Sequence, residues 1–332
     1  MPLFHHKSEE EKQADARARE LQTEHQADQV ASIESLQQGG LPVQAKRRLA
    51  ELAKNPNHLF TSDLSVSEFL LTRHEGLKPI TQVMGSCFYH VGYSGLLMRG
   101  MWTGSSEMHM ITQAYDNARD LALGRLREEA EMVGASAVIG VRLKKAEYEW
   151  GSDTIEYTAV GTAVHVEGAA PAEQVALTTL TGEDYWKLLQ AGYGPVGVAG
   201  GNCVYYQVGW DTTNINYFWS GGWANREIGD LTQGIRAARY IAQQGMHNSA
   251  GRVGADGVVG VTIERHQREH EVEMQDDTRR TDMIFTFLTM GTAVARLKIA
   301  RPQSTPKLVV PLSGRGLSRI RPSAEFQGSE SE

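Results

Sequence analysis

Two groups of side chains in this sequence have the chemistry of metal ligands. Cys87 and His90 form a Cys-x-x-His pair, and His266 and His270 lie four residues apart among alternating Glu and Arg residues. Thiolate and imidazole groups suit zinc or copper, but a site needs three or four ligands, and neither group has a third ligand nearby in the sequence. A transition metal is the one cofactor that these residues could hold, and we predict none.

Both groups also have a structural interpretation. Cys87 and Cys203 are the two cysteines of the chain, and each lies in an apolar stretch. A free cysteine in such a stretch behaves as a small core residue. His266 and His270 lie among opposite charges, which commonly pair across the strands of a solvated hairpin. We therefore predict two buried thiols and a charged hairpin arm.

A third group of residues is aromatic. Tyr217, Phe218, Trp219 and Trp223 fall within the segment NYFWSGGW, and Trp102 lies in a similar loop earlier in the chain. Aromatic side chains beside glycine and serine are typical of contacts with a subunit or another partner. They could equally pack onto their own domain, because large loop aromatics rarely stay in water. The sequence leaves both interpretations open.

Motifs and composition disfavour several classes of function. The chain has no nucleophile elbow, zinc-protease motif, phosphate-binding loop or dinucleotide fingerprint, so we predict that it is not an enzyme. Its net charge of -7 disfavours nucleic-acid binding, and no apolar run reaches the roughly 20 residues of a membrane helix. An acidic start without a signal-peptide core, together with the low cysteine content, indicates the cytoplasm.

The elements that carry these residues occur twice. The segment VGASAVIGVRL at 133–143 returns as VGADGVVGVTI at 253–263. Extending the alignment in both directions pairs Cys87 with Cys203 and aligns two GTAV segments with each other. The number of residues that separates equivalent positions increases along the chain. Insertions in surface loops between repeated elements produce such a drift. The sequence therefore predicts an internal duplication that covers most of the chain.

Each repeat has the pattern strand, helix, strand, strand. Apolar residues recur at helical spacing over 111–133 and again over 231–253, and Gly134 and Gly254 follow as helix stops. The spacing then changes to two, which predicts a core strand with one apolar face in each repeat, formed by Ala137, Ile139, Val141 and Leu143 and by Gly257, Val259, Val261 and Ile263. Gly140 and Gly260, on the opposite face, leave room for the close approach of another element.

The duplicated segments resemble a known family. ARDLA at 118–122, GASAVIG at 134–140, GADGVVG at 254–260 and the GTAV segments are similar to motifs of the YbjQ-like family, small bacterial proteins labelled heavy-metal-binding domains. The resemblance implies an α+β fold of two duplicated β-α-β-β (dodecin/YbjQ-like) domains, each an antiparallel sheet packed on one helix. It also implies ring-forming homo-oligomers, typically pentamers. No ligand motif of the family can be placed on this sequence.

These patterns predict four regions. Residues 1–55 form an N-terminal helical extension, in which the segment GGLP separates a Glu- and Gln-rich stretch from a short amphipathic helix at Val43–Lys54. The first YbjQ-like domain spans 56–170 and the second spans 171–300. Residues 301–332 are rich in Pro, Ser, Gly and Arg, which predicts a disordered tail.

Two functions from different classes follow from this organisation and from the family resemblance. The first is a non-enzymatic structural or binding module of unknown ligand that self-associates into a ring, most simply a homopentamer, through sheet edges and helix faces. The alternative is a heavy-metal or small-ligand binding protein with sites at subunit junctions, where ligand spacing is hidden from a single sequence. A protein partner could bind through the N-terminal helix or the C-terminal tail. Neither a membrane nor a nucleic acid is expected as a partner.

Overall fold

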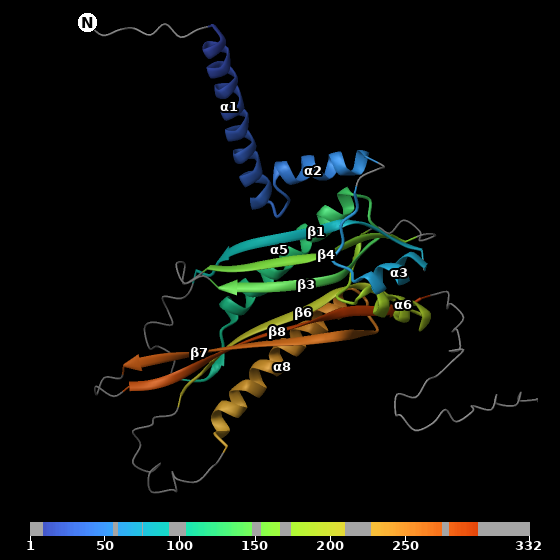
Figure 1. Cartoon of the computed structure of the whole chain (residues 1–332). Coiled ribbons are helices and arrows are strands. Elements are labelled where there is room, and N and C mark those ends of the chain that lie inside the picture. The colour runs from blue at the N-terminus through green and yellow to red at the C-terminus, as the bar shows by residue number, and fades with distance from the viewer. Residues whose placement is uncertain are drawn as a thin grey trace, which may run out of the picture.

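The computed structural model describes residues 9–55, 59–74, 76–92, 104–147, 154–166, 174–209, 227–273 and 279–297 of the 332-residue chain. The protein is α+β, with N-terminal helices and two four-stranded sheets packed on helices (Figure 1). The predicted fold class is confirmed at this level. The predicted disordered tail at 301–332 lies outside the described residues. Among the described helices, none is long and apolar enough to cross a membrane.

The first described residues form two helices. Helix α1 spans Glu9–Gln37 and α2 spans Val43–Lys54, which are the bounds predicted for the short amphipathic helix. Arg125, in the core of the following region, donates hydrogen bonds to the carbonyl oxygens of Leu36 at 3.1 Å and Gly40 at 3.2 Å. These bonds fix the turn between the helices, while α1 projects away from the sheets (Figure 1).

Two halves follow, and their long strands and helices come in the same order. The first half, residues 59–166, contains α3 (Val66–His74), β1 (Leu77–His90), β2 (Ser106–Glu107), α5 (His109–Met132), β3 (Ala137–Glu147) and β4 (Thr154–Val166). The second half, residues 174–297, contains β5 (Ala176–Leu177), α6 (Gly182–Gln190), β6 (Tyr193–Gln207), α8 (Gly229–Arg252), β7 (Gly257–Glu273) and β8 (Arg279–Arg296). Both contain the predicted strand, helix, strand, strand. The short helices α3 and α6 are additions that the sequence patterns did not predict.

Each half contributes three long antiparallel strands to one sheet. Strand β4 pairs with β1 and β3, and β8 pairs with β6 and β7. Each sheet takes its fourth strand from the other half: β5 adds parallel to β3, and β2 adds antiparallel to β6. The strand orders are β1-β4-β3-β5 and β2-β6-β8-β7. The sheets therefore differ from the prediction in being completed by exchange, which covers edges whose backbone groups need partners.

Small residues let each long helix lie close to its own sheet. A Cβ on Gly85 of β1 would lie 2.1 Å from the carbonyl oxygen of Ala122, and one on Gly201 of β6 would lie 2.2 Å from that of Ala242. Helix α5 packs on β1 and β4 but also contacts β6 of the second half, whereas α8 packs on β6 and β8. Strand β6 therefore has α8 on one face and α5 on the other.

The helix stops follow the sequence prediction. Gly134 and Gly254 have left-handed φ angles of 71° and 67°. The N–H group of the next residue, Ala135, donates back to the carbonyl of Ala130 at 3.0 Å, and the second half repeats this bond. This arrangement satisfies a helix carbonyl that would otherwise lack a partner.

A β-bulge interrupts β3 and β7 at equivalent positions. The pairing register shifts after Ile139 in β3 and after Val259 in β7, and Gly140 and Gly260 have left-handed φ angles of 65° and 62°. A Cβ on Gly140 would meet nothing closer than 3.9 Å. At Gly140 the predicted reason, close approach of another element, is therefore wrong, because the position needs glycine for its backbone conformation. At Gly260 both reasons apply, since a Cβ would lie 3.1 Å from the Leu180 side chain.

Because of the bulge, the prediction that β3 has one apolar face is wrong. One extra residue reverses the alternation of side chains. Alternate residues that point to one side of the sheet before the bulge therefore point to the other side after it. Val141 and Leu143 lie in the large core cluster with residues of α5, whereas Ala137 and Ile139 lie in a second cluster on the opposite side with Tyr185 of α6. All four side chains are buried, but on two faces.

Strand β7 is not the core strand that the sequence predicts. Val141 and Leu143 in β3 are 2% and 5% exposed, whereas the equivalent Val261 and Ile263 in β7 are each 42% exposed. The two strands have the same motif and the same bulge, so local sequence does not explain this difference. Strand β3 is covered by β5 and by other residues of the second half, while β7 is the last strand of its sheet.

Candidate functional site

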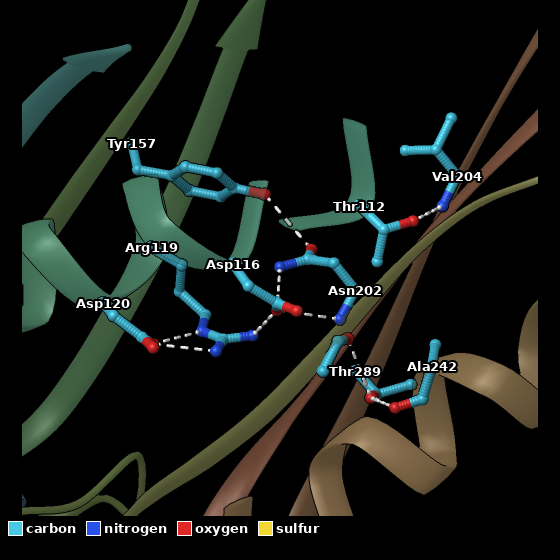
Figure 2. A network of polar contacts seen from close by, with 10 residues as sticks. Thr112, Asp116, Arg119, Asp120, Tyr157, Asn202, Val204, Ala242 and Thr289 are labelled. Atoms are coloured by element: carbon cyan, nitrogen blue, oxygen red, sulfur yellow. Dashed lines mark hydrogen bonds and ion pairs between the residues drawn. The ribbon is translucent and has the colours of Figure 1, made fainter. Parts of the chain in front are cut away.

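The junction between the two halves contains a buried polar network (Figure 2). Asp116 of α5 accepts hydrogen bonds at one oxygen from Arg119 at 2.6 Å, from the Asn202 side-chain amide at 2.9 Å and from the Asn202 backbone N–H at 3.3 Å. The Tyr157 hydroxyl donates to Asn202 Oδ1 at 3.3 Å. Arg119, Asn202 and Tyr157 are buried. The network therefore joins α5 and β4 of the first half to β6 of the second.

The single positive charge of this network is paired with two of its own carboxylates. Arg119 donates two further hydrogen bonds to Asp120, at 2.8 and 2.9 Å. Burial opposes the charge of Arg119, but the carboxylates of Asp116 and Asp120 outweigh it and raise the pKa of the guanidinium. Burial also raises the pKa of Tyr157, which keeps the phenol neutral and able to donate. Paired polar groups of this kind hold the elements that carry them in one arrangement.

Backbone bonds complete the contact between α5 and β6. The N–H group of Met108 donates to the carbonyl of Val204 at 2.8 Å, and the Val204 N–H donates to the Thr112 hydroxyl at 3.0 Å. Strand β2 extends the pairing, with Glu107 opposite Tyr205. Both backbone groups of Val204 are thus satisfied by the first half.

The opposite edge of the junction lies at the bulge of β3. Gly140 N–H donates to the Leu180 carbonyl at 2.8 Å, and Val141 N–H donates to that of Thr178 at 2.9 Å. In return, Thr178 N–H donates to the Val138 carbonyl at 2.9 Å. The bulge directs two consecutive N–H groups outward, so the segment after β5 is held along the edge of β3.

A second polar group lies near the turn end of the β7–β8 hairpin, where Asp282 pairs with His270. Asp282 is fully buried and accepts hydrogen bonds from Tyr206, from Arg280 at 2.7 and 2.9 Å and from the Gly209 N–H at 2.6 Å. Burial would raise the pKa of Asp282, but the bonds from Arg280, Tyr206 and Gly209 outweigh it and lower the pKa. Burial, reinforced by Asp282, raises the pKa of Tyr206 to about 12. The His270 ring lies 6.4 Å from the Tyr206 ring.

The structure separates the predicted metal-ligand candidates. Cys87 is buried, and burial raises the pKa of its thiol, whereas His90 is exposed. His266 is exposed on β7, and His270 belongs to the hairpin group instead. Cys203 is buried in the second half. In the described part of the chain, no group of three His, Cys, Asp or Glu side chains could hold a metal ion.

The structure does not describe the predicted aromatic residues, and the sequence did not predict the network around Asp116. Trp102, Tyr217, Phe218, Trp219 and Trp223 all lie outside the described residues. The network around Asp116 was missed, because charged residues on a helix are usually a solvated face. A signal was present in the alignment of the repeats, in which Asp116, Arg119 and Asn202 match Arg236, Arg239 and Ser86.

Comparison with known proteins identifies the family. Residues 78–167 match a family described as YbjQ, "Putative heavy-metal-binding". The chain is 32% identical over 293 residues to the encapsulin nanocompartment protein Rv1762c of Mycobacterium tuberculosis, an alignment that covers 83% of this chain and 99% of that protein. The chain therefore belongs to the YbjQ (UPF0145) family, as the motif resemblance predicts.

Other relatives match a smaller part of the chain. A UPF0145 protein of Clostridium perfringens is 43% identical over 63 residues, which is 19% of this chain and 58% of the relative. One of Methanoregula boonei is 34% identical over 113 residues, which is 34% of this chain and 79% of the relative. No solved structure matches the chain.

Proposed function

We propose that this protein is a non-enzymatic structural module whose halves are both dodecin/YbjQ-like domains, spanning 56–170 and 171–300, and whose copies self-associate into a ring of five. The observation that carries this proposal is the exchange of edge strands between the halves. A half that needs a neighbouring strand to complete its sheet is suited to repetition, because contacts between unlike surfaces repeat around an axis.

The name of the Mycobacterium tuberculosis relative links that protein to a protein compartment. That protein is named an encapsulin nanocompartment protein, and we extend this association to the present chain as a cytoplasmic component that works with a protein compartment. Helix α1 is the proposed contact for a protein partner. It projects from the sheets (Figure 1) and exposes Leu21, Val30 and Ile33, which favours binding through that helix.

Native mass spectrometry of untagged protein tests self-association and ligand content together. We expect assemblies in multiples of the 36.6 kDa chain, with five copies dominant and no bound mass. A monomer at micromolar concentration would refute self-association. A stoichiometric metal or small molecule on the assembly would instead support the alternative function, a heavy-metal or small-ligand binding protein with sites at subunit junctions.

Co-expression with an encapsulin shell protein tests the proposed setting. We expect the chain to co-elute with assembled shells and to lose this property when residues 1–27 are removed. That truncation keeps Asp28, which forms an ion pair with Arg47 at 2.6 Å, so the base of α1 stays attached. Removal of 301–332 serves as the comparison and tests the tail as the binding segment. Retention of both truncated chains in the shell would contradict the role of α1.

A further inference from the structure

The internal junction joins two different surfaces, and each half has both. The first half contributes α5, β2 and the edge of β3, which we call its helix side. The second half contributes residues 174–180 and β6, which we call its strand side. The helix side of the second half and the strand side of the first half stand outside the hydrogen bonds described above, although Leu64 and Val259 pack against the apolar cluster that contains Tyr185. Their residues show whether they could form the same contact with another copy of the chain.

The helix side of the second half repeats the contact residues of the first. Met108 and Thr112, which bond to β6, have Ile228 and Thr232 as their equivalents. Within the described strands, β7 ends its sheet, and its bulge repeats the left-handed glycine of β3 at Gly260. Ile228, Val261 and Ile263 are exposed here, whereas their equivalents Met108, Val141 and Leu143 lie in the core cluster that spans both halves.

The strand side of the first half already has the backbone arrangement that the same contact would require. The Asp63 N–H donates to the Thr162 hydroxyl at 3.2 Å, just as the equivalent Thr179 N–H donates to the Thr292 hydroxyl at 2.9 Å. The next residue but one, Ser65, caps α3 as Thr181 caps α6. Residues 59–64 therefore lie on their own sheet in the way that residues 175–180 do while these bind β3.

The outer face of β1 completes this surface. Met84 and Phe88 are 52% and 60% exposed. The equivalent residues of β6 are Gly200, where a Cβ would lie 3.3 Å from Arg119, and Val204, which is 3% exposed. The cover on β6 is provided by α5, so the matching cover on β1 would be an α8 helix.

We infer that one copy of the chain binds the next by repeating its internal junction, with the β7 edge and α8 of one copy against residues 59–64 and β1 of another. This inference rests on the proposed self-association and specifies its contact. Parallel pairing equivalent to Ala137 with Ala176 places Gly257 opposite Phe60 of the next copy. The contact covers Val261 and Ile263 with the face that carries Met84 and Phe88, and it removes an exposed sheet edge.

The residues that differ between the two junctions keep them distinct. Asp116 and Asp120 of the internal network correspond to Arg236 and Tyr240, and Asn202 corresponds to Ser86. An α8 helix in the place of α5 would leave Asn202 without its carboxylate partner, and burying such an unsatisfied group is costly. Each helix side therefore prefers one strand side, and chains join in a single direction.

Disulfide trapping tests the predicted pairing. Phe60 and Gly257 are exposed, and a Cβ on Gly257 meets nothing within 4 Å. Strands about 4.8 Å apart meet the geometry of a disulfide. We expect mildly oxidised F60C/G257C protein to give a ladder of covalent multimers in denaturing gels. The A137C/A176C variant should close within one chain and stay at monomer mass.

Matched single variants make the trapping directional. A mixture of F60C protein and G257C protein should give covalent dimers and nothing larger, because each pair of chains then has one bond. A L21C/G257C variant places the first cysteine on exposed α1 and should not form the ladder. If A137C/A176C closes but F60C/G257C stays monomeric, while the unmodified chain is oligomeric, the inferred contact is wrong and the proposed self-association stands.

Dissociation gives an independent measurement. V261D and F88D each place a carboxylate on the inferred contact, and we expect association at least about 30-fold weaker, as for a central interface residue. L21D changes an exposed apolar residue on α1, outside the inferred contact, and should leave association unchanged. Unchanged association of V261D and F88D in an oligomeric background overturns the inference. A monomeric unmodified chain would overturn both the inference and the proposed function.

Discussion

Removal of the Asp116 carboxylate should destabilise the whole chain, because one oxygen of this group accepts hydrogen bonds from both halves. In an Asp116→Ala variant, Asn202 loses the acceptor for its side-chain amide and for its backbone N–H, and both donors are buried. Arg119 keeps its two bonds to Asp120. The cost therefore comes from Asn202 more than from the arginine.

The magnitude follows from the number of donors left without a partner. A buried donor without an acceptor costs about 1–3 kcal/mol. Asp116 is about a third exposed, with a side-chain value of 35%, so water can replace part of the lost bonding. We expect Asp116→Ala to lower the free energy of unfolding by about 2–3 kcal/mol. Asp116→Asn keeps an acceptor oxygen but loses the charge, so its cost should be smaller, about 1 kcal/mol.

Urea unfolding at one fixed protein concentration measures these differences, because self-association would otherwise contribute to the apparent stability. Glu131→Ala is the matched control, since Glu131 is an exposed acidic residue on the same helix. It should stay within about 0.5 kcal/mol of the unmodified chain. An Asp116→Ala variant that unfolds at the same midpoint as Glu131→Ala would refute the assignment of the network as the bond between the halves.

Three further predictions concern other parts of the molecule. Gly201→Ala should lower the free energy of unfolding by about 1–3 kcal/mol, because the new Cβ would displace α8, and a thermal or urea midpoint equal to that of the unmodified chain would count against this packing. Because the pKa of Asp282 is lowered in the fold, its stabilisation is present above its unfolded pKa of about 4 and is lost as the pH falls through the folded value; Asp282→Asn should flatten acid unfolding there, and an unaltered acid transition would contradict the assignment. Cys87 and Cys203 should resist thiol reagents in the native protein and react in urea, whereas rapid native labelling of both would show that they are accessible.

The features that could be predicted from the sequence are those fixed by neighbouring residues. The bounds of α2 follow from amphipathic spacing after the GGLP break, and the helix stops at Gly134 and Gly254 follow from glycine after the last apolar turn. The buried positions of Cys87 and Cys203 follow from the apolar strands around them. In each case the decisive interactions lie within a few residues of the position.

The features that could not be predicted depend on contacts across long stretches of chain. Val141 and Val261 occupy the same motif and the same bulge, yet one is buried and the other exposed, because the cover of Val141 comes from the second half. The Asp116 network joins residues 86 positions apart. A periodic pattern identifies an apolar face without showing which element covers it, so the exchange of strands was invisible to it.

The exchange of β2 and β5 also limits how the chain can come apart. Partners on one polypeptide meet at an effective concentration on the order of millimolar, whatever the concentration of the protein. Dilution can therefore release whole chains but not halves, and any closed assembly contains an even number of halves. A proteolytic cut between residues 166 and 174 would leave every described contact of the internal junction in place. It would nevertheless make that junction depend on concentration, as a contact between separate molecules does.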